Sequence, residues 1–90
     1  MYWSYMSFPD NTEVTFSETH DDGTVGVWIE TPIDGGFKSA HCIIPSFRWD
    51  EIDGYGADEM KRLDRYVRNN AHIIAEMSLE KEDALKMARR

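Results

Sequence analysis

The chain contains a single cysteine, Cys42, so no disulfide can form within it. A lone thiol in a sequence without a recognisable signal peptide is typical of a reducing compartment, and we therefore expect a cytoplasmic protein. No apolar run approaches the length of a membrane span, so no membrane helix is predicted. The paired ligand spacings of zinc sites, the oxygen ligands of a calcium loop and the glycine-rich loops that bind phosphates are also missing. The sequence therefore predicts no metal and no cofactor.

Basic residues are scarce in the first part of the chain, where residues 1–56 contain only Lys38 and Arg48. The ten acidic residues of the same segment are Asp10, Glu13, Glu18, Asp21, Asp22, Glu30, Asp34, Asp50, Glu51 and Asp53. Residues 57–90 carry seven acids and eight bases, so the formal net charge of −7 comes from the first part. Ten of the eleven aromatic residues also precede residue 57. An acidic, aromatic-rich region attracts basic proteins and repels nucleic acid.

The length of ninety residues predicts a single domain, residues 1–90. The hydrophobic fraction of 41% and the eleven aromatic side chains favour a folded core over disorder. A domain of this size buries only about 60–65% of the surface of its unfolded chain. Pairing of two copies is one way for a small chain to bury more surface, so a homodimer is a reasonable expectation.

Three segments alternate between apolar and polar residues in the manner of strands: 13–19, 24–31 and 37–44. Turn-forming residues separate them at 20–23 and at 32–36. This pattern predicts an antiparallel meander over residues 13–44. Residues 1–12 are expected to form an N-terminal arm or an edge strand, which would be a fourth strand. Trp28 alternates away from the apolar residues of its segment, so it is expected on the opposite face of the sheet.

From Ala57 onwards the apolar residues follow the period of a helix. They recur at steps of three, four and seven: Met60, Leu63, Val67, Ile74 and Met77. Ser78 either caps a separate final helix or lies inside one unbroken helix, and both alternatives remain open. The expected fold class is α+β. It comprises a three- to four-stranded antiparallel meander followed by one C-terminal helix, or two, over residues 57–90, packed on one face of the sheet.

Residues 45–56 follow neither period and are expected to form a loop rich in acids and aromatics. The predicted partner-binding residues are those of this loop together with two from the first turn: Trp49, Asp50, Glu51, Asp53, Tyr55, Asp21 and Asp22. In a second interpretation, Trp49 and Tyr55 close the end of the core while the acids face water. The sequence leaves both interpretations open.

Residues suited to chemistry are few. Cys42 and His72 would have to meet as nucleophile and base, yet Cys42 lies in a segment typical of a core strand. Metal ligands would have to come from residues without paired spacing: His20, Asp21, Asp22, His41, Cys42 and His72. A basic stretch at helical spacing is diluted by neighbouring acids, which favours a solvated helix face over direct nucleic-acid binding: Lys61, Arg62, Arg65 and Arg68. The sequence therefore predicts a protein that is not an enzyme.

Three functions are compatible with these features. The first is a small acidic protein that binds a basic protein surface. An inhibitor of a nucleic-acid-binding protein by charge mimicry, of the anti-restriction or anti-CRISPR type found in phages, fits the size and the charge. The second is an antitoxin-like or regulatory subunit that acts as a dimer. The order of meander and helix is similar to that of small antitoxins of the HicB kind, but the proline-glycine stretch expected there before the helix is absent. The third is a small enzyme that uses Cys42 and His72.

Overall fold

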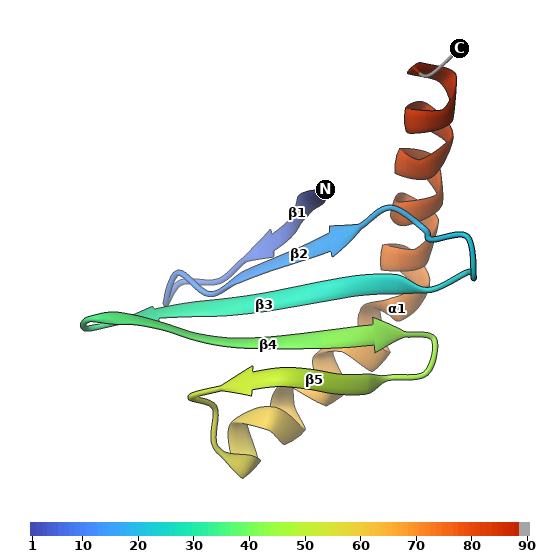
Figure 1. Ribbon diagram of the computed structural model, residues 1–90. Helices are drawn as coiled ribbons and strands as arrows, with labels where there is room; N and C mark the ends of the chain where they lie inside the picture. Colours follow the sequence, from blue (N-terminus) through green and yellow to red (C-terminus); the bar gives the residue numbers. More distant parts are fainter. Residues whose placement is uncertain (89–90) are drawn as a thin grey trace.

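The computed structural model describes residues 1–88 and shows a five-stranded antiparallel sheet followed by one long helix (Figure 1). The strands are β1 (Tyr2–Ser7), β2 (Glu13–Ser17), β3 (Val25–Ile33), β4 (Gly36–Ile44) and β5 (Arg48–Asp53), and the helix is α1 (Ala57–Ala88). Each strand pairs with its neighbours in the chain, so the order across the sheet is β1-β2-β3-β4-β5. The predicted α+β class and the antiparallel meander are confirmed.

Two strands lie where the sequence suggested an arm and a loop. Of the two alternatives for residues 1–12, the edge strand is the one observed, as β1. The prediction of a loop over residues 45–56 is wrong, because β5 occupies its middle. The alternation fails there because β5 contains one extra residue opposite β4, between the pairs Ser39–Asp53 and His41–Asp50. The sheet therefore has five strands rather than three or four.

The connection between β3 and β4 is shorter than predicted. Pro32 and Ile33 were expected in a turn, but they extend β3 and pair with Phe37 and Gly36 of β4. Gly35 turns the chain with a φ of +82°, in a region that glycine enters without steric cost. The resulting hairpin projects beyond the other strands in Figure 1.

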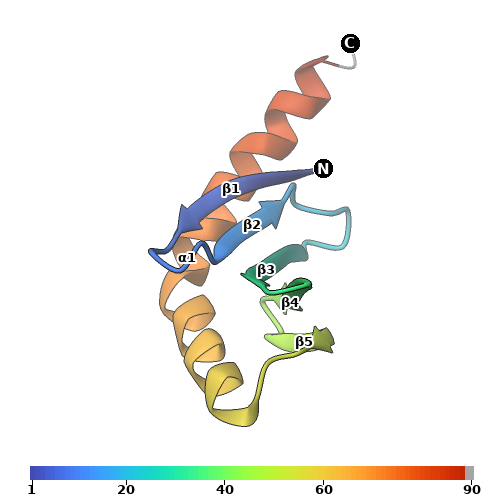
Figure 2. The ribbon, with the colours of Figure 1, turned by 90° about the vertical axis from the view of Figure 1, so that its left-hand side faces the viewer.

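The core lies on one face of the sheet. Alternating strand residues and two helical residues have at most 3% of their surface exposed and form one cluster: Val14, Phe16, Val25, Val27, Ile29, Cys42, Ile44, Val67 and Ile74. Figure 2 shows α1 on one side of the sheet, crossing the strands from β5 to beyond β1. None of the described elements covers the other side, and we refer to that side as the open face.

Side-chain hydrogen bonds tie α1 to both edges of the sheet. On β5, Trp49 Nε1 donates to Asp64 Oδ1 at 2.9 Å. On β1, the Tyr5 hydroxyl donates to Asn70 Oδ1 at 2.8 Å. The amide nitrogen of Asn70 donates to the carbonyl of Tyr66 one turn earlier, at 2.8 Å. Asn70 therefore interrupts the apolar stripe of the helix in order to bind the edge strand.

The helix is unbroken at Ser78, so the alternative of a separate final helix is wrong. The Ser78 side chain is fully buried. Its hydroxyl donates to the carbonyl of Ser17 at 2.7 Å and accepts a hydrogen bond from the Thr19 hydroxyl at 2.9 Å. The last two residues of the predicted helical segment, Arg89 and Arg90, lie outside the described residues. Among residues 1–88, no helical segment combines the length and the apolar character that a membrane crossing requires.

Candidate functional site

The open face carries the side chains that alternate with the core residues. Trp28 lies on it, as the sequence predicted. An open hollow of about 470 Å³ is bordered by residues of four strands: Tyr2, Thr15, Trp28, Glu30 and Ser39. A second hollow of about 590 Å³ shares Glu30 with the first and is bordered by Asn11, Glu13, Glu30, Pro32 and Phe37. Polar and aromatic side chains therefore line this face together.

His41 lies at the centre of a chain of polar groups on the open face. Its Nδ1 is 2.8 Å from Asp50 Oδ1 of β5, and its Nε2 is 3.3 Å from the hydroxyl of Tyr2 of β1. Trp28 of β3 packs against the imidazole, with the two ring centroids 4.8 Å apart. Side chains from three other strands thus hold one histidine ring in place.

Gly26 explains how Tyr2 and His41 meet although two strands lie between them. A Cβ atom at this position of β3 would lie 2.7 Å from the Tyr2 hydroxyl and 2.8 Å from His41 Nε2. Distances this short are not tolerated between such atoms, so any side chain at position 26 would displace one group or both. The backbone N–H of Gly26 donates to Ser17 Oγ at 2.9 Å. Glycine therefore makes room for the contact between phenol and imidazole.

The extra residue of β5 brings a second carboxylate to His41. In a regular strand, consecutive residues point to opposite faces, which would separate Asp50 from Glu51. Glu51 instead has a φ of +52°, within the irregular part of the pairing between β4 and β5. One ligand atom from each of His41, Asp50 and Glu51 lies within 4.8 Å of the other two. Within residues 1–88, this is the one group of three or more such side chains whose ligand atoms lie close enough together to hold a metal ion.

Acids dominate the charge of the open face. Glu13 and Glu30 are exposed and lie directly opposite each other in the ladder between β2 and β3. Asp50 and Glu51 add two more carboxylates beyond Trp28. By contrast, α1 on the other side of the sheet exposes basic side chains, among them Lys61, Arg62 and Arg65. The same helix also carries acids, seven against six bases over residues 57–88, so the net negative charge comes mainly from the residues before the helix.

Two of the predicted partner-binding aromatics lie on the core side. Trp49 is half-buried against the core, and the hydrogen bond from its indole holds the pKa of the Asp64 carboxyl below its usual value. The Tyr55 hydroxyl lies 2.8 Å from Thr31 Oγ1, and burial raises the pKa of this phenol. These contacts correspond to the second interpretation, in which both aromatics close the end of the core. Of the remaining loop residues, Asp50 and Glu51 lie near His41, and Asp53 is exposed at the end of β5.

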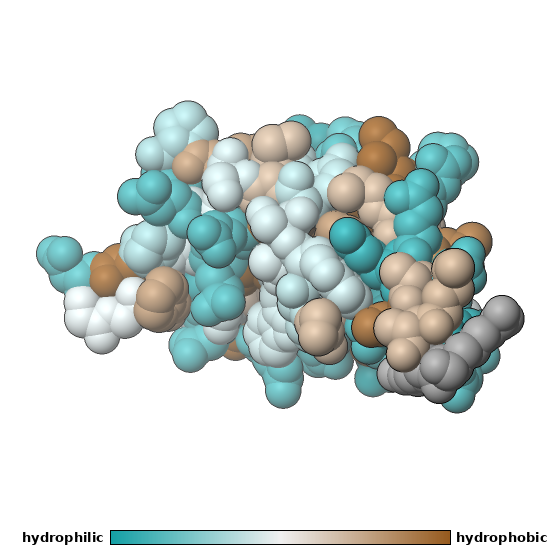
Figure 3. Space-filling view, turned by 90° about the horizontal axis from the view of Figure 1, so that it is seen from above, coloured by the Kyte–Doolittle hydropathy of each residue, from teal (hydrophilic) through white to brown (hydrophobic). Residues whose placement is uncertain are grey.

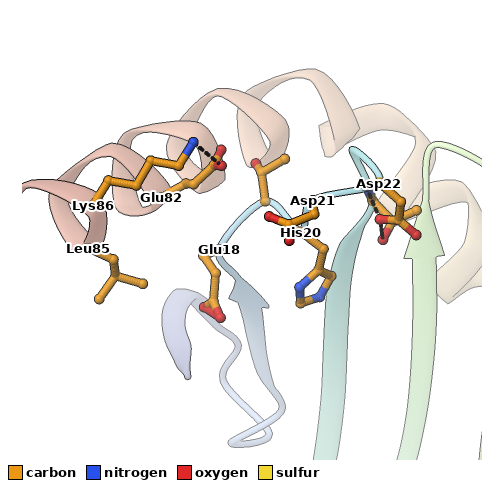
Figure 4. A pocket seen from close by; sticks show the side chains of 9 residues that line it. Glu18, His20, Asp21, Asp22, Glu82, Leu85 and Lys86 are labelled. Atoms are coloured by element: carbon orange, nitrogen blue, oxygen red, sulfur yellow. Dashed lines mark hydrogen bonds and ion pairs between the residues drawn. The ribbon is translucent and has the colours of Figure 1, made fainter. Parts of the chain in front are cut away.

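Asp21 and Asp22 lie in the turn between β2 and β3, away from Asp50 and Glu51. They border a hollow of about 510 Å³ between this turn and the C-terminal part of α1 (Figure 4). Asp22 accepts hydrogen bonds from the backbone and the hydroxyl of Thr24, at 3.0 and 2.7 Å, and these bonds lower its pKa. Figure 4 shows Glu82 and Lys86 reaching over the hollow from α1, where they form an ion pair at 2.9 Å. Asp22 therefore stabilises the turn between β2 and β3 through its hydrogen bonds to Thr24.

Cys42 and His72 occupy very different surroundings. Cys42 has no exposed surface, and burial raises the pKa of its thiol to about 12, with a smaller contribution from the Asp64 carboxylate. The His72 side chain is 86% exposed on α1 and pairs with Glu76 at 3.2 Å. A thiol with so high a pKa is almost entirely protonated at neutral pH and is a poor nucleophile. The structure therefore does not bring the two together as nucleophile and base.

Tyr2 and His41 were missed as members of the site. The sequence gives no partner of His41 at a paired metal-ligand spacing, because its partners Asp50 and Glu51 come from another strand. The alternation of β4 did carry a signal, because His41 stands between Ala40 and Cys42 and must therefore point away from the core. No comparable signal existed for Tyr2, whose position depends on the pairing of β1 with β2.

Exposed apolar side chains are scattered where the molecule is viewed from above. Figure 3 shows small, separate hydrophobic areas among hydrophilic ones on this side. Scattered apolar side chains are normal on a protein surface and do not by themselves indicate a binding site.

None of the protein-family models, curated proteins or solved structures compared with this chain matches it.

Proposed function

We propose that the protein binds the basic surface of another protein through the open face and is not an enzyme. The observation that carries this proposal is the cross-strand pair of Glu13 and Glu30. Like charges directly opposite each other destabilise a sheet. Among residues 1–88, neither of these carboxylates forms an ion pair. A cationic side chain of a partner, placed between them, would turn this repulsion into attraction.

Aromatic side chains beside the acids supply the contacts that charge alone does not provide. Trp28 is half-buried between the two acidic parts of the face, and Tyr2 and Phe37 are 41% and 61% exposed. Aromatic residues that become buried on binding contribute much of the affinity of protein interfaces, whereas peripheral charges mainly speed association. The open face thus combines carboxylates that attract a basic partner at long range with aromatic side chains that can become buried against it.

The charge of the open face also restricts the class of partner. Carboxylates on this side repel DNA and RNA, but they resemble phosphates to a protein whose own surface binds nucleic acid. Inhibition of such a protein in the cytoplasm by charge mimicry, as in anti-restriction or anti-CRISPR proteins, is the specific form that we propose. Two open faces would repel each other, so a homodimer would not form through this surface.

The substitution Glu30→Lys tests the proposal. It replaces the repulsive pair with an attractive one between Glu13 and Lys at position 30, so the thermal midpoint should rise. The same change reverses the charge at the centre of the open face, so association with a basic partner should slow. A partner is first recovered with the wild-type protein in a salt-sensitive pulldown of basic proteins, and association is then measured by surface plasmon resonance at low salt.

Glu80→Lys is the matched control, because Glu80 is an exposed acid on α1 and the change in net charge is the same. The proposal requires slower association for Glu30→Lys than for Glu80→Lys. Equal association rates for the two variants would show that only net charge matters, and would contradict a binding role of the open face. An unchanged rate in both variants would also contradict it.

A further inference from the structure

We propose that His41, Asp50 and Glu51 form a binding site for a divalent metal ion, with Zn²⁺ the most suitable. This inference does not rest on the proposed partner, because it concerns the three side chains alone. They offer one imidazole nitrogen and two carboxylate oxygens within 4.8 Å of one another. Imidazole suits zinc and its neighbours in the transition series, and carboxylate oxygens complete such sites in proteins.

The ligand atoms would have to move only a short way to bind Zn²⁺. Zinc binds nitrogen and oxygen ligands at about 2.0–2.2 Å, which places neighbouring ligand atoms roughly 3–3.6 Å apart in a tetrahedral site. His41 Nδ1 and Asp50 Oδ1 are already 2.8 Å apart. Glu51 is exposed, so its carboxylate can move to the ion without disturbing the core. The ion would lie between His41 Nδ1 and Asp50 Oδ1, with the neutral imidazole binding through the lone pair of Nδ1 and keeping its one ring proton on Nε2, and water completes the coordination.

The surroundings of His41 resemble those of a metal-binding histidine. Such a histidine usually donates its other ring N–H to an oxygen, which fixes the tautomer and the orientation of the ring. The Tyr2 hydroxyl lies 3.3 Å from His41 Nε2 and can accept this hydrogen, which leaves the lone pair of Nδ1 directed at the site. The absent side chain of Gly26 permits this contact, and Trp28 packs against the ring.

The backbone of β5 explains how the second carboxylate comes to lie beside His41. A positive φ is uncommon for a residue such as glutamate, and Glu51 has a φ of +52°. Residues held in such conformations cluster at functional sites, and strand irregularities often redirect a side chain there. Here the irregularity places two consecutive carboxylates beside the same histidine. A regular β5 would leave only Asp50 next to His41.

Calorimetric titration of the metal-free protein with ZnCl₂ tests the inference, together with NMR of the histidine ring nitrogens. We expect one Zn²⁺ per chain and a shift of the His41 resonances on saturation. Glu51→Gln, at an exposed position, should weaken binding about tenfold or more because a charged ligand is lost. Tyr2→Phe should weaken it about 10–100-fold, as is typical when the partner of a ligating histidine is removed.

His72→Ala is the necessary control, because His72 and Glu76 are one turn apart, 3.2 Å from each other, and could bind zinc by themselves. Affinity unchanged in His72→Ala and reduced in Glu51→Gln supports the site. Binding that disappears in His72→Ala but persists in Glu51→Gln would overturn it, as would the absence of heat and of any His41 shift at millimolar Zn²⁺. Circular dichroism of each variant verifies that it is folded.

Discussion

A hydrogen bond between the side chains of Trp49 and Asp64 links β5 to α1. The indole donates to Asp64 Oδ1 at 2.9 Å, and this hydrogen bond lowers the pKa of the carboxyl, with a further contribution from Arg68. A pKa lower in the folded than in the unfolded state stabilises the fold above the unfolded value of about 3.9. That stabilisation is lost as the pH falls through the folded pKa.

Trp49→Phe should therefore lower the free energy of unfolding by ~1 kcal/mol or more at neutral pH, because the donor is lost and a smaller aromatic ring replaces the indole. The variant should also lose less stability than the wild type on acidification, since the pKa of Asp64 moves towards its usual value. Urea denaturation at neutral and acidic pH measures both effects. Equal losses on acidification in the two proteins would show that the hydrogen bond contributes nothing to acid sensitivity.

Single residues also show what the sequence could reveal about the candidate site. Asp50 and Glu51 were among the predicted binding residues, because clustered acids are visible in any sequence. The position of Trp28 was predicted as well, since alternation alone assigns it to a face. The grouping around His41 could not be predicted, because it depends on the extra residue in β5 and on the passage of Tyr2 over Gly26. Both depend on how neighbouring strands pair, and alternation within each strand does not reveal that pairing.

At the scale of elements, α1 is held to the end of β2 by Ser78. Its hydroxyl donates to the carbonyl of Ser17 and accepts from Thr19, with no exposed surface at Ser78. Ser78→Ala removes the donor from a buried hydrogen bond, which costs about 1–3 kcal/mol, and the better helix propensity of alanine offsets about 0.5 kcal/mol of this. We expect a net loss of about 0.5–2.5 kcal/mol in urea denaturation.

Glu80→Ala is the corresponding control, at an exposed position two residues further along the same helix. It should change the free energy of unfolding by less than about 0.5 kcal/mol, as surface substitutions usually do. A similar loss in both variants would indicate a general sensitivity of this part of α1, and the specific role of Ser78 would be wrong.

Elements differ in how well the sequence predicted them. The sequence predicted β2, β3, β4 and the start of α1. Apolar side chains recur there with the period of a strand or of a helix that has one buried face. The fifth strand was missed because Asp50, Glu51 and Asp53 are poor strand formers and the extra residue breaks the alternation. Its pairing with β4 and the packing of Trp49 against the core override that local preference.

The whole molecule carries a formal net charge of −7, and its acids are concentrated on the sheet. Self-repulsion of this kind weakens a compact state, and salt relieves it by shortening the Debye length from about 30 Å at 0.01 M to about 10 Å at 0.1 M. The thermal midpoint should therefore rise by a few degrees over this range of NaCl, as followed by circular dichroism. Glu30→Lys should show a smaller rise. A midpoint that falls with NaCl would mean that attractive ion pairs outweigh the repulsion.

The helix α1 follows all five strands in the chain, and this order affects how the protein is synthesised. Translation completes all five strands before any residue of the helix is available. Until then, the apolar face that includes Phe16, Val27 and Ile29 is not yet covered by α1. An unfinished chain that ends before Ala57 would present this face to other nascent chains or to chaperones. Premature termination before Ala57 would therefore produce an aggregating polypeptide rather than a smaller working protein.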